Sequence, residues 1–346
     1  MAKRIAINGF GRIGRLTLRN LLSNRDVEIV AINDLTNNKT LAHLFKYDSA
    51  QGTYPSKVEA SEKHITIGKK KIIALTERDP SKLPWKKLKV DIVLECTGVF
   101  RTYEKAGLHL DAGAKRVILS APAKSDNIQT VVLGVNDKDI DPSNRIFSNA
   151  SCTTNCLAPV AKLINESWGF VQASMTTTHA YTADQRIQDA PHRDLRRARA
   201  AAFNIVPTTT GAADAVGKVY PAVKGKMFAM AIRVPVITGS LVELNVIVEK
   251  EVTAEQVNKK FLAASRGKMK GVLEYQDAPL VSSDIIGNKY SSIFDSQLTK
   301  VDGKMIKVVS WYDNEAGYSA RLSDLCRRIA KLPLVKKRKV KNKAMP

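Results

Sequence analysis

The first 150 residues alternate short apolar runs with longer amphipathic stretches. Six runs have the pattern of buried strands, and several are apolar almost throughout, as strands covered on both faces of a parallel sheet are. They span residues 4–8, 27–33, 91–97, 116–120, 131–135 and 145–149. Helical spacing of apolar residues marks 13–24 and 39–48 between them. Because strands that alternate with helices build parallel sheets, this half predicts a doubly wound α/β domain, a Rossmann fold.

The pattern changes from Ser151 onward. Helical spacing continues to Ser167, and a long β-rich run then covers residues 228–250, where the pattern suits an antiparallel or mixed sheet with one face on a core. A final helix is expected over residues 315–331. The second half therefore predicts an α+β domain with a mostly antiparallel sheet.

A chain of 346 residues is too long for one comfortable core, so two domains are expected. We place a nucleotide-binding domain at 1–150, completed by a C-terminal helix at 315–333. The second domain covers 151–314, and a basic tail follows at 334–346.

Charge is the one unusual feature of the composition. Lys and Arg number 55 against 33 Asp and Glu, which gives a net charge of +22. This surplus favours anionic partners such as phosphorylated substrates, nucleic acid or anionic lipid, but it does not bear on the fold. The tail contains the run KKRKVKNK, for which we predict a solvated segment. Weak electrostatic attachment to nucleic acid or an anionic surface is the alternative, and a nuclear-localisation-like run is a third interpretation.

The location of the protein is suggested by what the sequence lacks. No apolar run approaches the roughly 20 residues that span a bilayer, and the N-terminus enters a strand-like pattern without a signal peptide. Four cysteines do not make a disulfide scaffold in a chain of this size. We therefore expect a cytoplasmic protein whose cysteines are catalytic, metal-binding or packed rather than bridged.

The stretch INGFGRIGR carries Gly9, Gly11 and Gly14 as G-x-G-x-x-G, directly after the first strand and at the start of the first helix. Glycines there permit a tight turn and let backbone N–H groups approach a pyrophosphate at the positive end of the helix. Asp34 ends the next strand, at the place where a carboxylate holds the ribose 2′-hydroxyl of a dinucleotide. A 2′-phosphate would be repelled there, so NAD is favoured over NADP.

Two cysteines lie four residues apart in SNASCTTNCLAP. Helix-capping residues precede Cys152, so its thiol lies at or beside a helix N-terminus, where the partial positive charge lowers a thiol pKa. Cys156 lies one turn later on an apolar stripe and is expected to be a small buried hydrophobe. A disulfide at this spacing on a helix would be strained, and no nearby His or Cys completes a zinc site, so no metal is expected.

A nucleophilic cysteine needs a base within hydrogen-bond reach. Among the five histidines, His179 ends a strand-like run in MTTTHAYT, where strand ends line clefts, and His192 is its rival. The other three have the character of surface or packing residues: His43, His64 and His109.

Five motifs occur in order: INGFGRIGR, ASCTTNC, THAYT, DLRRARAAAFNIVPTTTGAA and SWYDNEAGYS. With them the chain closely resembles phosphorylating glyceraldehyde-3-phosphate dehydrogenases of the bacterial type, from residue 3 to about 333. The resemblance implies NAD-dependent oxidation of D-glyceraldehyde 3-phosphate with inorganic phosphate to 1,3-bisphosphoglycerate, in glycolysis or gluconeogenesis. It places the nucleophile on Cys152, which forms a hemithioacetal and then a thioester, and the activating base on His179. Erythrose-4-phosphate dehydrogenase shares this scaffold, and a binding protein that kept the fold is an alternative of another class.

The resemblance also implies further site residues. Cofactor positions fall on Gly9, Gly11, Arg12, Ile13, Gly14, Asp34, Arg78, Ser120 and Asn314. The substrate phosphate falls on Thr182, Arg197 and Arg233, and the attacking phosphate on Ser151, Thr153, Thr210 and Gly211. Residues 181–204 correspond to a loop that reaches a neighbouring subunit's cofactor in this family, so a homotetramer is expected. Ala190 stands where NAD-specific members usually carry leucine, which leaves some NADP use open.

Overall fold

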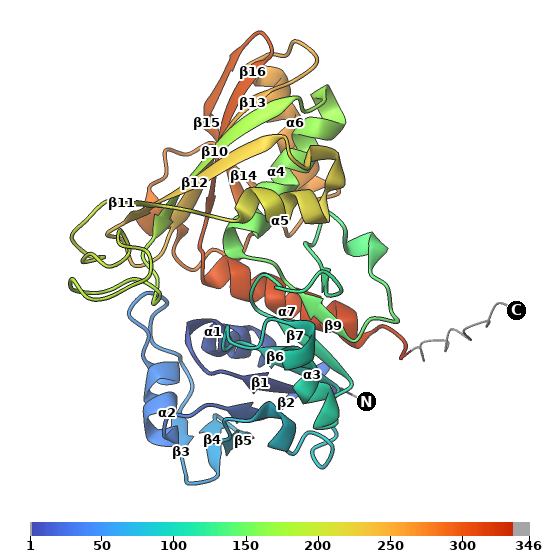
Figure 1. Ribbon diagram of the computed structural model, residues 1–346, viewed down its shortest axis with the longest axis vertical. Helices are drawn as coiled ribbons and strands as arrows, with labels where there is room; N and C mark the ends of the chain where they lie inside the picture. The colour runs from blue at the N-terminus through green and yellow to red at the C-terminus, as the bar shows by residue number, and fades with distance from the viewer. Residues whose placement is uncertain (1, 335–346) are drawn as a thin grey trace, which may run out of the picture.

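The computed structural model describes residues 2–334, and the chain folds into two lobes stacked along its long axis (Figure 1). Met1 and residues 335–346 lie outside this range, so the predicted basic tail, apart from Leu334, lies outside the described residues. Within the described range, no helix is long and apolar enough to cross a membrane.

The first lobe contains a sheet of nine strands among the described residues, seven of them in one continuous parallel run. In spatial order they are β3 (Val58–Ala60), β4 (His64–Ile67), β5 (Lys70–Leu75), β2 (Val27–Asn33), β1 (Lys3–Asn8), β6 (Ile92–Glu95), β7 (Arg116–Leu119), β9 (Ile146–Ser148) and β8 (Gln129–Thr130). Helices of this lobe are α1 (Arg12–Leu21), α2 (Asn38–Lys46) and α3 (Tyr103–Asp111). The last helix, α7 (Ala316–Ala330), returns to pack beside α1 and against this core.

The second lobe contains a sheet of seven strands among the described residues, and four of its six pairings are antiparallel. In spatial order they are β11 (Val206–Thr208), β12 (Met227–Val234), β10 (Gln172–Ala180), β13 (Ser240–Ile247), β16 (Met305–Tyr312), β15 (Ser292–Asp302) and β14 (Leu273–Gln276). Its helices are α4 (Cys152–Trp168), α5 (Ala212–Val219) and α6 (Ala254–Arg266). In the part of the chain that the structure describes, four 3₁₀ turns complete the two lobes: Pro80–Lys82, Asp137–Asp139, Pro221–Val223 and Ser282–Ile285.

The predicted fold class is confirmed, with one strand misplaced. Residues 131–135 are not a strand: the chain pairs only at Gln129 and Thr130, and then turns. Val131 and Val132 are fully buried, each in the core of a different lobe, which explains the apolar run without a strand. Gly134, at φ +81°, belongs to the turn. The predicted helix at 13–24 ends earlier, at Leu21.

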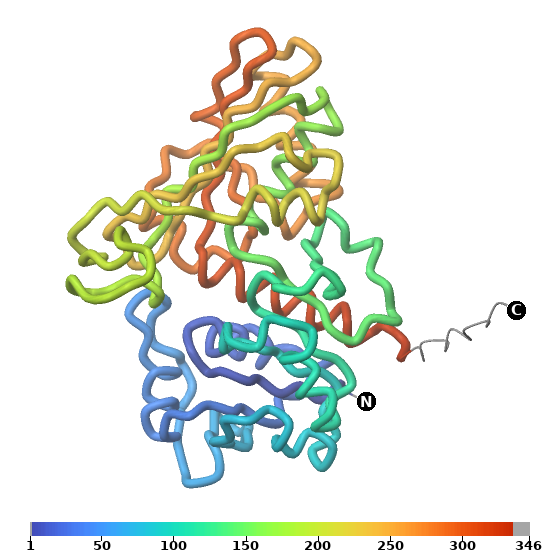
Figure 2. Tube along the Cα trace, viewed as in Figure 1, coloured from blue at the N-terminus to red at the C-terminus, as the bar shows by residue number. Residues whose placement is uncertain are grey.

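The chain crosses between the lobes after β9 and again before α7, as the tube in Figure 2 shows. The two crossings are joined by the Tyr318 hydroxyl, which donates to the Ala150 carbonyl at 2.9 Å. The start of α4, and Cys152 with it, therefore lies at the junction of the lobes.

Candidate active site

A tight turn between β9 and α4 sets the position of Cys152. Ala150 adopts φ +54°, a left-handed conformation that costs a non-glycine residue about 1 kcal/mol. Three hydrogen bonds hold the turn: Ser148 Oγ accepts from Ala150 N, Asn155 Nδ2 donates to Asn149 O, and Tyr318 donates to Ala150 O. Ser151 then caps the helix, since its Oγ accepts from the Thr154 backbone N–H at 3.1 Å. Cys152 is the first residue of α4, as the sequence predicted.

His179 faces this thiol from the end of β10. The Cys152 Sγ lies 3.4 Å from His179 Nε2, within hydrogen-bond reach for sulfur. On the other side of the ring, Nδ1 lies 2.6 Å from the Ala180 carbonyl oxygen. Arg233 Nη1 also lies 3.1 Å from Nδ1, but its two hydrogens are used by the Ala180 carbonyl and Thr182 Oγ1. Because a carbonyl can only accept, Nδ1 carries the proton and Nε2 presents its lone pair to the thiol. The geometry therefore makes His179 a proton acceptor for Cys152.

Burial sets the charge state of the pair. It raises the pKa of the Cys152 thiol, although Arg233 and the Thr153 hydrogen bonds oppose the shift. Burial, reinforced by Arg233, lowers the pKa of His179 to about 3. The prediction of a lowered thiol pKa at the helix start is therefore wrong. The resting pair is a neutral thiol beside a neutral imidazole, and ionisation proceeds by passing the proton from Sγ to Nε2.

The His179 shift predicts a loss of stability in acid. Between the unfolded pKa of about 6.5 and the folded pKa of about 3, the unfolded chain binds the proton and the folded chain does not. Stability is therefore complete above pH 6.5 and falls as the pH decreases, by about 2 kcal/mol at pH 5. Melting temperatures measured from pH 8 to pH 5 should fall more steeply for the native chain than for His179→Gln. Parallel slopes would contradict this assignment.

Two arginines converge beside the Cys152–His179 pair. Arg233 Nη1 donates to the Ala180 carbonyl at 3.1 Å and to Thr182 Oγ1 at 3.0 Å. Thr182 in turn donates to Asp184, which pairs with Arg197 at 2.5 Å. Burial would raise the pKa of Asp184, but Thr182 and both arginines hold it below its usual value. The structure thus brings the three predicted substrate-phosphate residues into one chain of contacts, with Asp184 balancing their charge.

Residues predicted for the attacking phosphate lie at two helix starts. Besides its capping role, the Ser151 hydroxyl contacts Thr154 Oγ1 at 2.7 Å. Gly211 is the N-cap of α5, and Thr210 Oγ1 accepts from the Ala212 backbone N–H at 3.3 Å. The N–H groups of a first helical turn have no intrahelical acceptor, so both starts offer donors to an anion.

Tyr312 is a site residue that the sequence reasoning missed. It is 1% exposed, packs edge-on against His179, and its hydroxyl lies 2.9 Å from both Thr153 Oγ1 and Thr177 Oγ1. The Thr153 hydroxyl is thus engaged with Tyr312, and its backbone N–H stays at the helix start. The only available signal was the position of Tyr312 inside the motif SWYDNEAGYS, since residues 305–312 were not predicted as a strand.

The glycine loop fits a dinucleotide. Gly9 has φ +91°, and a Cβ there would lie 2.7 Å from the Thr97 nitrogen, whereas a Cβ on Gly14 would lie 2.2 Å from the Gly9 oxygen. These two glycines are required by close backbone contacts. Gly11 differs, because a Cβ there would meet no atom within 4 Å, and it caps the start of α1, next to Arg12 and Ile13. The open side of the helix start matches the approach of a pyrophosphate.

Other predicted cofactor residues lie along strand ends. Asp34 follows β2, and its carboxylate accepts from the backbone N–H groups of Phe10 at 2.8 Å and Thr36 at 3.0 Å. Ser120 follows β7, and its backbone N–H donates to the Glu95 carbonyl at 2.9 Å. Arg78 is exposed beyond β5. Asn314 is buried between the lobes, where its Oδ1 accepts from Ser240 Oγ at 2.9 Å and from Thr238 Oγ1 at 3.2 Å.

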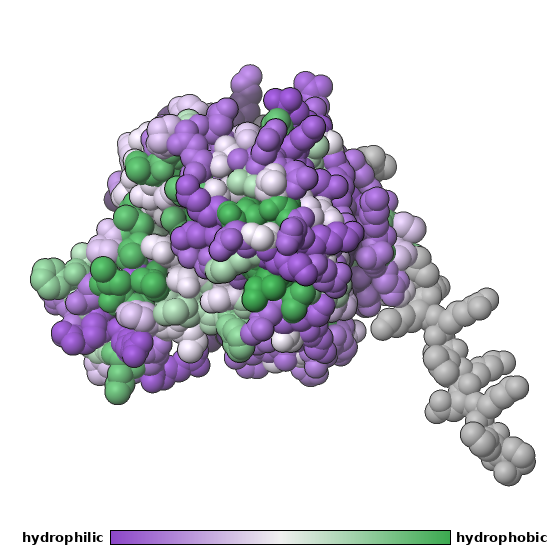
Figure 3. Space-filling model, turned by 90° about the horizontal axis from the view of Figure 1, so that it is seen from above, coloured by the Kyte–Doolittle hydropathy of each residue, from purple (hydrophilic) through white to green (hydrophobic). Residues whose placement is uncertain are grey.

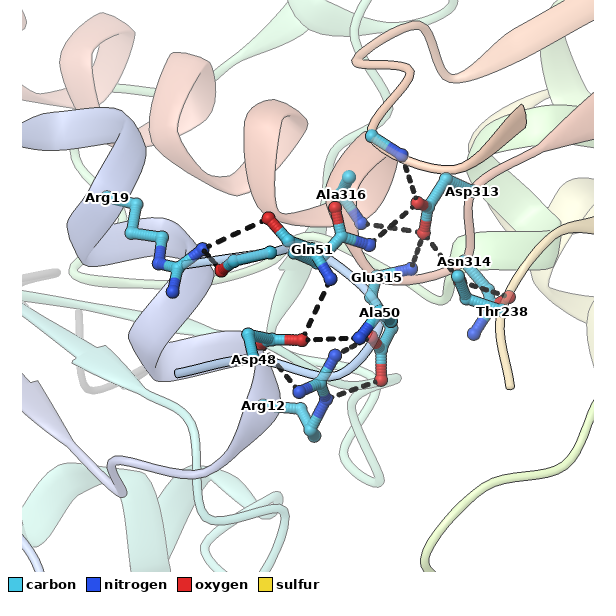
Figure 4. A network of polar contacts seen from close by, with 12 residues as sticks. Arg12, Arg19, Asp48, Ala50, Gln51, Thr238, Asp313, Asn314, Glu315 and Ala316 are labelled. Carbon is cyan, nitrogen blue, oxygen red and sulfur yellow. Dashed lines mark hydrogen bonds and ion pairs between the residues drawn. The ribbon is translucent and has the colours of Figure 1, made fainter. Parts of the chain in front are cut away.

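Arg12 belongs to a network that ties the loop to the junction (Figure 4). It donates to Asp48 at 2.6 Å and, through Nε, to Glu315 at 2.9 Å. Burial alone would lower the pKa of the guanidinium, but Glu315 and Asp48 together raise it. Gln51 Nε2 continues the network to Asp313 at 2.8 Å, beside Asn314. Sequence reasoning gave Arg12 to the cofactor alone and did not find its carboxylate partners.

The remaining candidates have structural partners. His192 contacts the backbone of Asp194 through Nδ1, whereas His179 meets the thiol, so the structure favours His179 over its rival. Cys156 is fully buried, with Ser292 Oγ at 3.6 Å and the Ser310 carbonyl at 3.7 Å, as predicted for packing. Its burial raises the pKa to about 12. All four cysteines are free, and no metal-ligand cluster occurs within residues 2–334.

Comparisons with known proteins agree with this geometry. A family model described as the NAD binding domain of glyceraldehyde 3-phosphate dehydrogenase matches residues 3–103, and the model of its C-terminal domain matches residues 151–314. The glyceraldehyde-3-phosphate dehydrogenase of Mycobacterium avium is 55% identical over 338 residues, 96% of this chain and 99% of the relative. That of Geobacillus stearothermophilus is 55% identical over 332 residues, 95% of this chain and 99% of the relative. The chain belongs to the glyceraldehyde-3-phosphate dehydrogenase family.

Proposed function

We propose that the protein oxidises D-glyceraldehyde 3-phosphate with NAD and inorganic phosphate to 1,3-bisphosphoglycerate. One observation carries the proposal: the Cys152 thiol at a helix start lies 3.4 Å from an acceptor nitrogen of His179, beside an arginine-lined anion site. NAD, for which Gly11 and Asp34 leave a fitting cradle, supplies the acceptor for the hydride when bound. The nucleophile, the base and the groups that bind the two phosphates come from the chain itself.

The first step is the attack of Cys152 on the aldehyde carbon. Sγ passes its proton to His179 Nε2 and forms a C–S bond, and His179 then gives this proton to the former carbonyl oxygen, which becomes the hydroxyl of a hemithioacetal. The free N–H groups at the start of α4 stabilise negative charge that develops on this oxygen. Arg233, Thr182 and Arg197 hold the substrate phosphate, so the aldehyde carbon is delivered to the sulfur.

In the second step His179 takes the hydroxyl proton as the hydride leaves the same carbon, which oxidises the hemithioacetal to a thioester. Inorganic phosphate then attacks the thioester carbon, forming the acyl phosphate and releasing the Cys152 thiolate, to which His179 returns the proton that it took from the hydroxyl. Ser151, Thr153, Thr210 and Gly211 lie at the two helix starts proposed to bind this phosphate. Their backbone N–H groups, together with the hydroxyls of Ser151 and Thr210, are suitable donors for an oxyanion.

We assign the dinucleotide to Gly9, Gly11, Arg12, Ile13 and Gly14, with Asp34 on the ribose, Arg78 and Ser120 along the cleft, and Asn314 on the carboxamide. The Asp34 carboxylate favours NAD, since a 2′-phosphate would meet its charge. The domain division proposed from the sequence gives every dinucleotide residue but Asn314 to the domain at 1–150 with 315–333. It gives Asn314 and the catalytic and phosphate-binding residues to the domain at 151–314.

A homotetramer is supported by the exposed apolar side chains of residues 181–205. Ile187, Leu195, Phe203 and Ile205 are between 71% and 86% exposed, which is unusual for large apolar residues. Apolar side chains gather at the left of Figure 3, on the side where the 181–205 segment projects in Figure 1. A second copy of the chain would cover them.

A cytoplasmic location and weak binding of nucleic acid or anionic surfaces through the basic tail are proposed on charge and sequence alone.

A steady-state assay tests the reaction. With glyceraldehyde 3-phosphate, NAD and phosphate, we expect reduction of NAD that depends on phosphate or arsenate, and slower turnover with NADP or with erythrose 4-phosphate. Full-rate oxidation without phosphate or arsenate would exclude the thioester route. A faster rate with erythrose 4-phosphate would move the assignment to that substrate.

A further inference from the structure

A cavity of about 820 Å³ lies away from the Cys152–His179 pair, on the junction of the two lobes. The first lobe contributes residues 133–135, 137 and 138, α7 from Arg321 to Arg328, and Lys331 just after that helix. The second lobe contributes the last turns of α4 and the segment at 268–272. Its volume is within the range of small-molecule sites.

The lining of this cavity is strongly cationic. Eight of its residues are basic and three are acidic. The basic residues are Lys138, Lys162, Lys268, Lys270, Arg321, Arg327, Arg328 and Lys331; the acidic ones are Asp137, Glu166 and Asp324. Ion pairs within residues 2–334 neutralise part of this charge, but they give no carboxylate partner to Lys138, Lys270 or Lys331. The cavity therefore keeps a surplus of positive charge, which attracts anions.

Arg321 gives the cavity a buried cationic donor. The residue is only 7% exposed, and its guanidinium reaches across the junction to donate to the Gly271 carbonyl while pairing with Asp324 at 2.5 Å. These two contacts fix the guanidinium at the wall of the cavity, where its positive charge adds to that of the lysines.

Lys162 also joins the lobes within the lining, where its ammonium donates to the Val135 carbonyl at 2.6 Å. The lining is therefore held by hydrogen bonds across the junction and is not only a set of surface lysines. Arginine and lysine together suit phosphoryl oxygens, which accept several charge-assisted hydrogen bonds at once.

We propose that this cavity binds a small molecule bearing several adjacent phosphoryl groups. Each phosphoryl group brings about one to two negative charges, so a short polyphosphate matches the surplus of cations better than a single phosphate or a carboxylate. A nucleoside polyphosphate and a polyphosphorylated polyol share this chemistry. The site is separate from the two phosphate sites of the proposed dehydrogenase reaction, and the inference stands without that reaction.

Titration calorimetry of the full chain with inorganic tripolyphosphate tests the proposal. NAD and inorganic phosphate are kept in excess so that the dehydrogenase sites are filled. We expect one site per chain, and an affinity about tenfold or more weaker in the double variant K138E/K270E, because two exposed cations of the lining become repulsive. Both side chains are exposed, so the variant should fold, and its melting temperature checks this.

The matched control is K69E/K71E, which makes the same change in net charge on exposed positions outside the cavity. Its affinity for tripolyphosphate should change by less than about twofold. An equal loss of affinity in both double variants would show that only net charge matters, and it would overturn the proposal. Unchanged binding in K138E/K270E would overturn it as well, as would loss of binding only when residues 335–346 are deleted.

Two further ligands separate the sources of the polyphosphate. If ATP binds more tightly than tripolyphosphate and its affinity falls in K138E/K270E, the ligand is a nucleoside polyphosphate. If myo-inositol hexakisphosphate shows the same tighter binding and the same loss, the ligand is a phosphorylated polyol. If a single-stranded oligonucleotide binds and tripolyphosphate does not, the surface takes nucleic acid and the proposal fails.

Discussion

Replacing Cys152 by Ser is expected to reduce kcat by about 10⁴-fold or more. A serine hydroxyl at the same helix start is a far weaker nucleophile, and its pKa lies well above that of the thiol, so His179 cannot ionise it to a useful extent. An ester in place of the thioester would also transfer its acyl group to phosphate more slowly. Substrate and NAD binding should change little, because Arg233 and the glycine loop are untouched.

Stopped-flow absorbance at the NADH band measures the loss, since the first turnover reports oxidation and the later turnovers report phosphorolysis. Cys156→Ser is the matched control, because it makes the same atomic change one helical turn later. The position is buried, and Ser292 Oγ and the Ser310 carbonyl already accept hydrogen bonds from the sulfur there. We expect this control to keep at least half of the native kcat. A Cys152→Ser chain within tenfold of the native rate would remove Cys152 as the nucleophile.

The start of α4 shows why part of the site was predictable from the sequence. Capping residues before an apolar helical pattern specify a helix start through local interactions, so Cys152 could be placed without the rest of the chain. The charge state of its thiol could not be predicted in this way. It depends on how deeply the second lobe buries the sulfur, and that burial raises the pKa that a helix N-terminus alone would lower.

Residues 131–135 show the same limit for the fold. An apolar run fits a strand when only the sequence is known, but the structure buries Val131 and Val132 in different cores and bends the chain at Gly134. The alternation of strands and helices around this run still specified the doubly wound sheet. The local pattern thus predicted the class of the fold, whereas tertiary packing determined that residues 131–135 do not form a strand.

The sequence motifs could not predict contacts between residues that are far apart in the sequence. Tyr312 reaches Thr153 across 159 positions, and Arg12 reaches Glu315 across 303. Neither pairing has a periodic signal. The first depends on how α4 packs against β16 within the second lobe, and the other on how α7 returns to pack beside α1. His179 could be named as a candidate base because a strand end lines a cleft, but its 3.4 Å contact with the sulfur, and the exclusion of His192, required the structure.

Replacing His179 by Gln is the second large effect, with kcat expected to fall by about 10²- to 10⁴-fold. Glutamine offers hydrogen bonds to the thiol but cannot accept its proton or that of the hemithioacetal hydroxyl. Glyceraldehyde 3-phosphate should still bind, since Arg233 keeps Thr182 and the Ala180 carbonyl as partners. His192→Gln, which changes the rival histidine in the same way, should leave kcat within about twofold.

The pH profile distinguishes a lost base from a disturbed fold. Without His179 the thiol must lose its proton to water, and its pKa is raised by burial. Below that pKa the thiolate fraction increases tenfold for each pH unit, so log kcat of His179→Gln should rise with a slope of about one between pH 7 and pH 9. The native chain, in which His179 removes the proton internally, should show a shallower slope over the same range. Two parallel profiles, with the variant only displaced to lower rates, would show that His179 positions the site without accepting the proton.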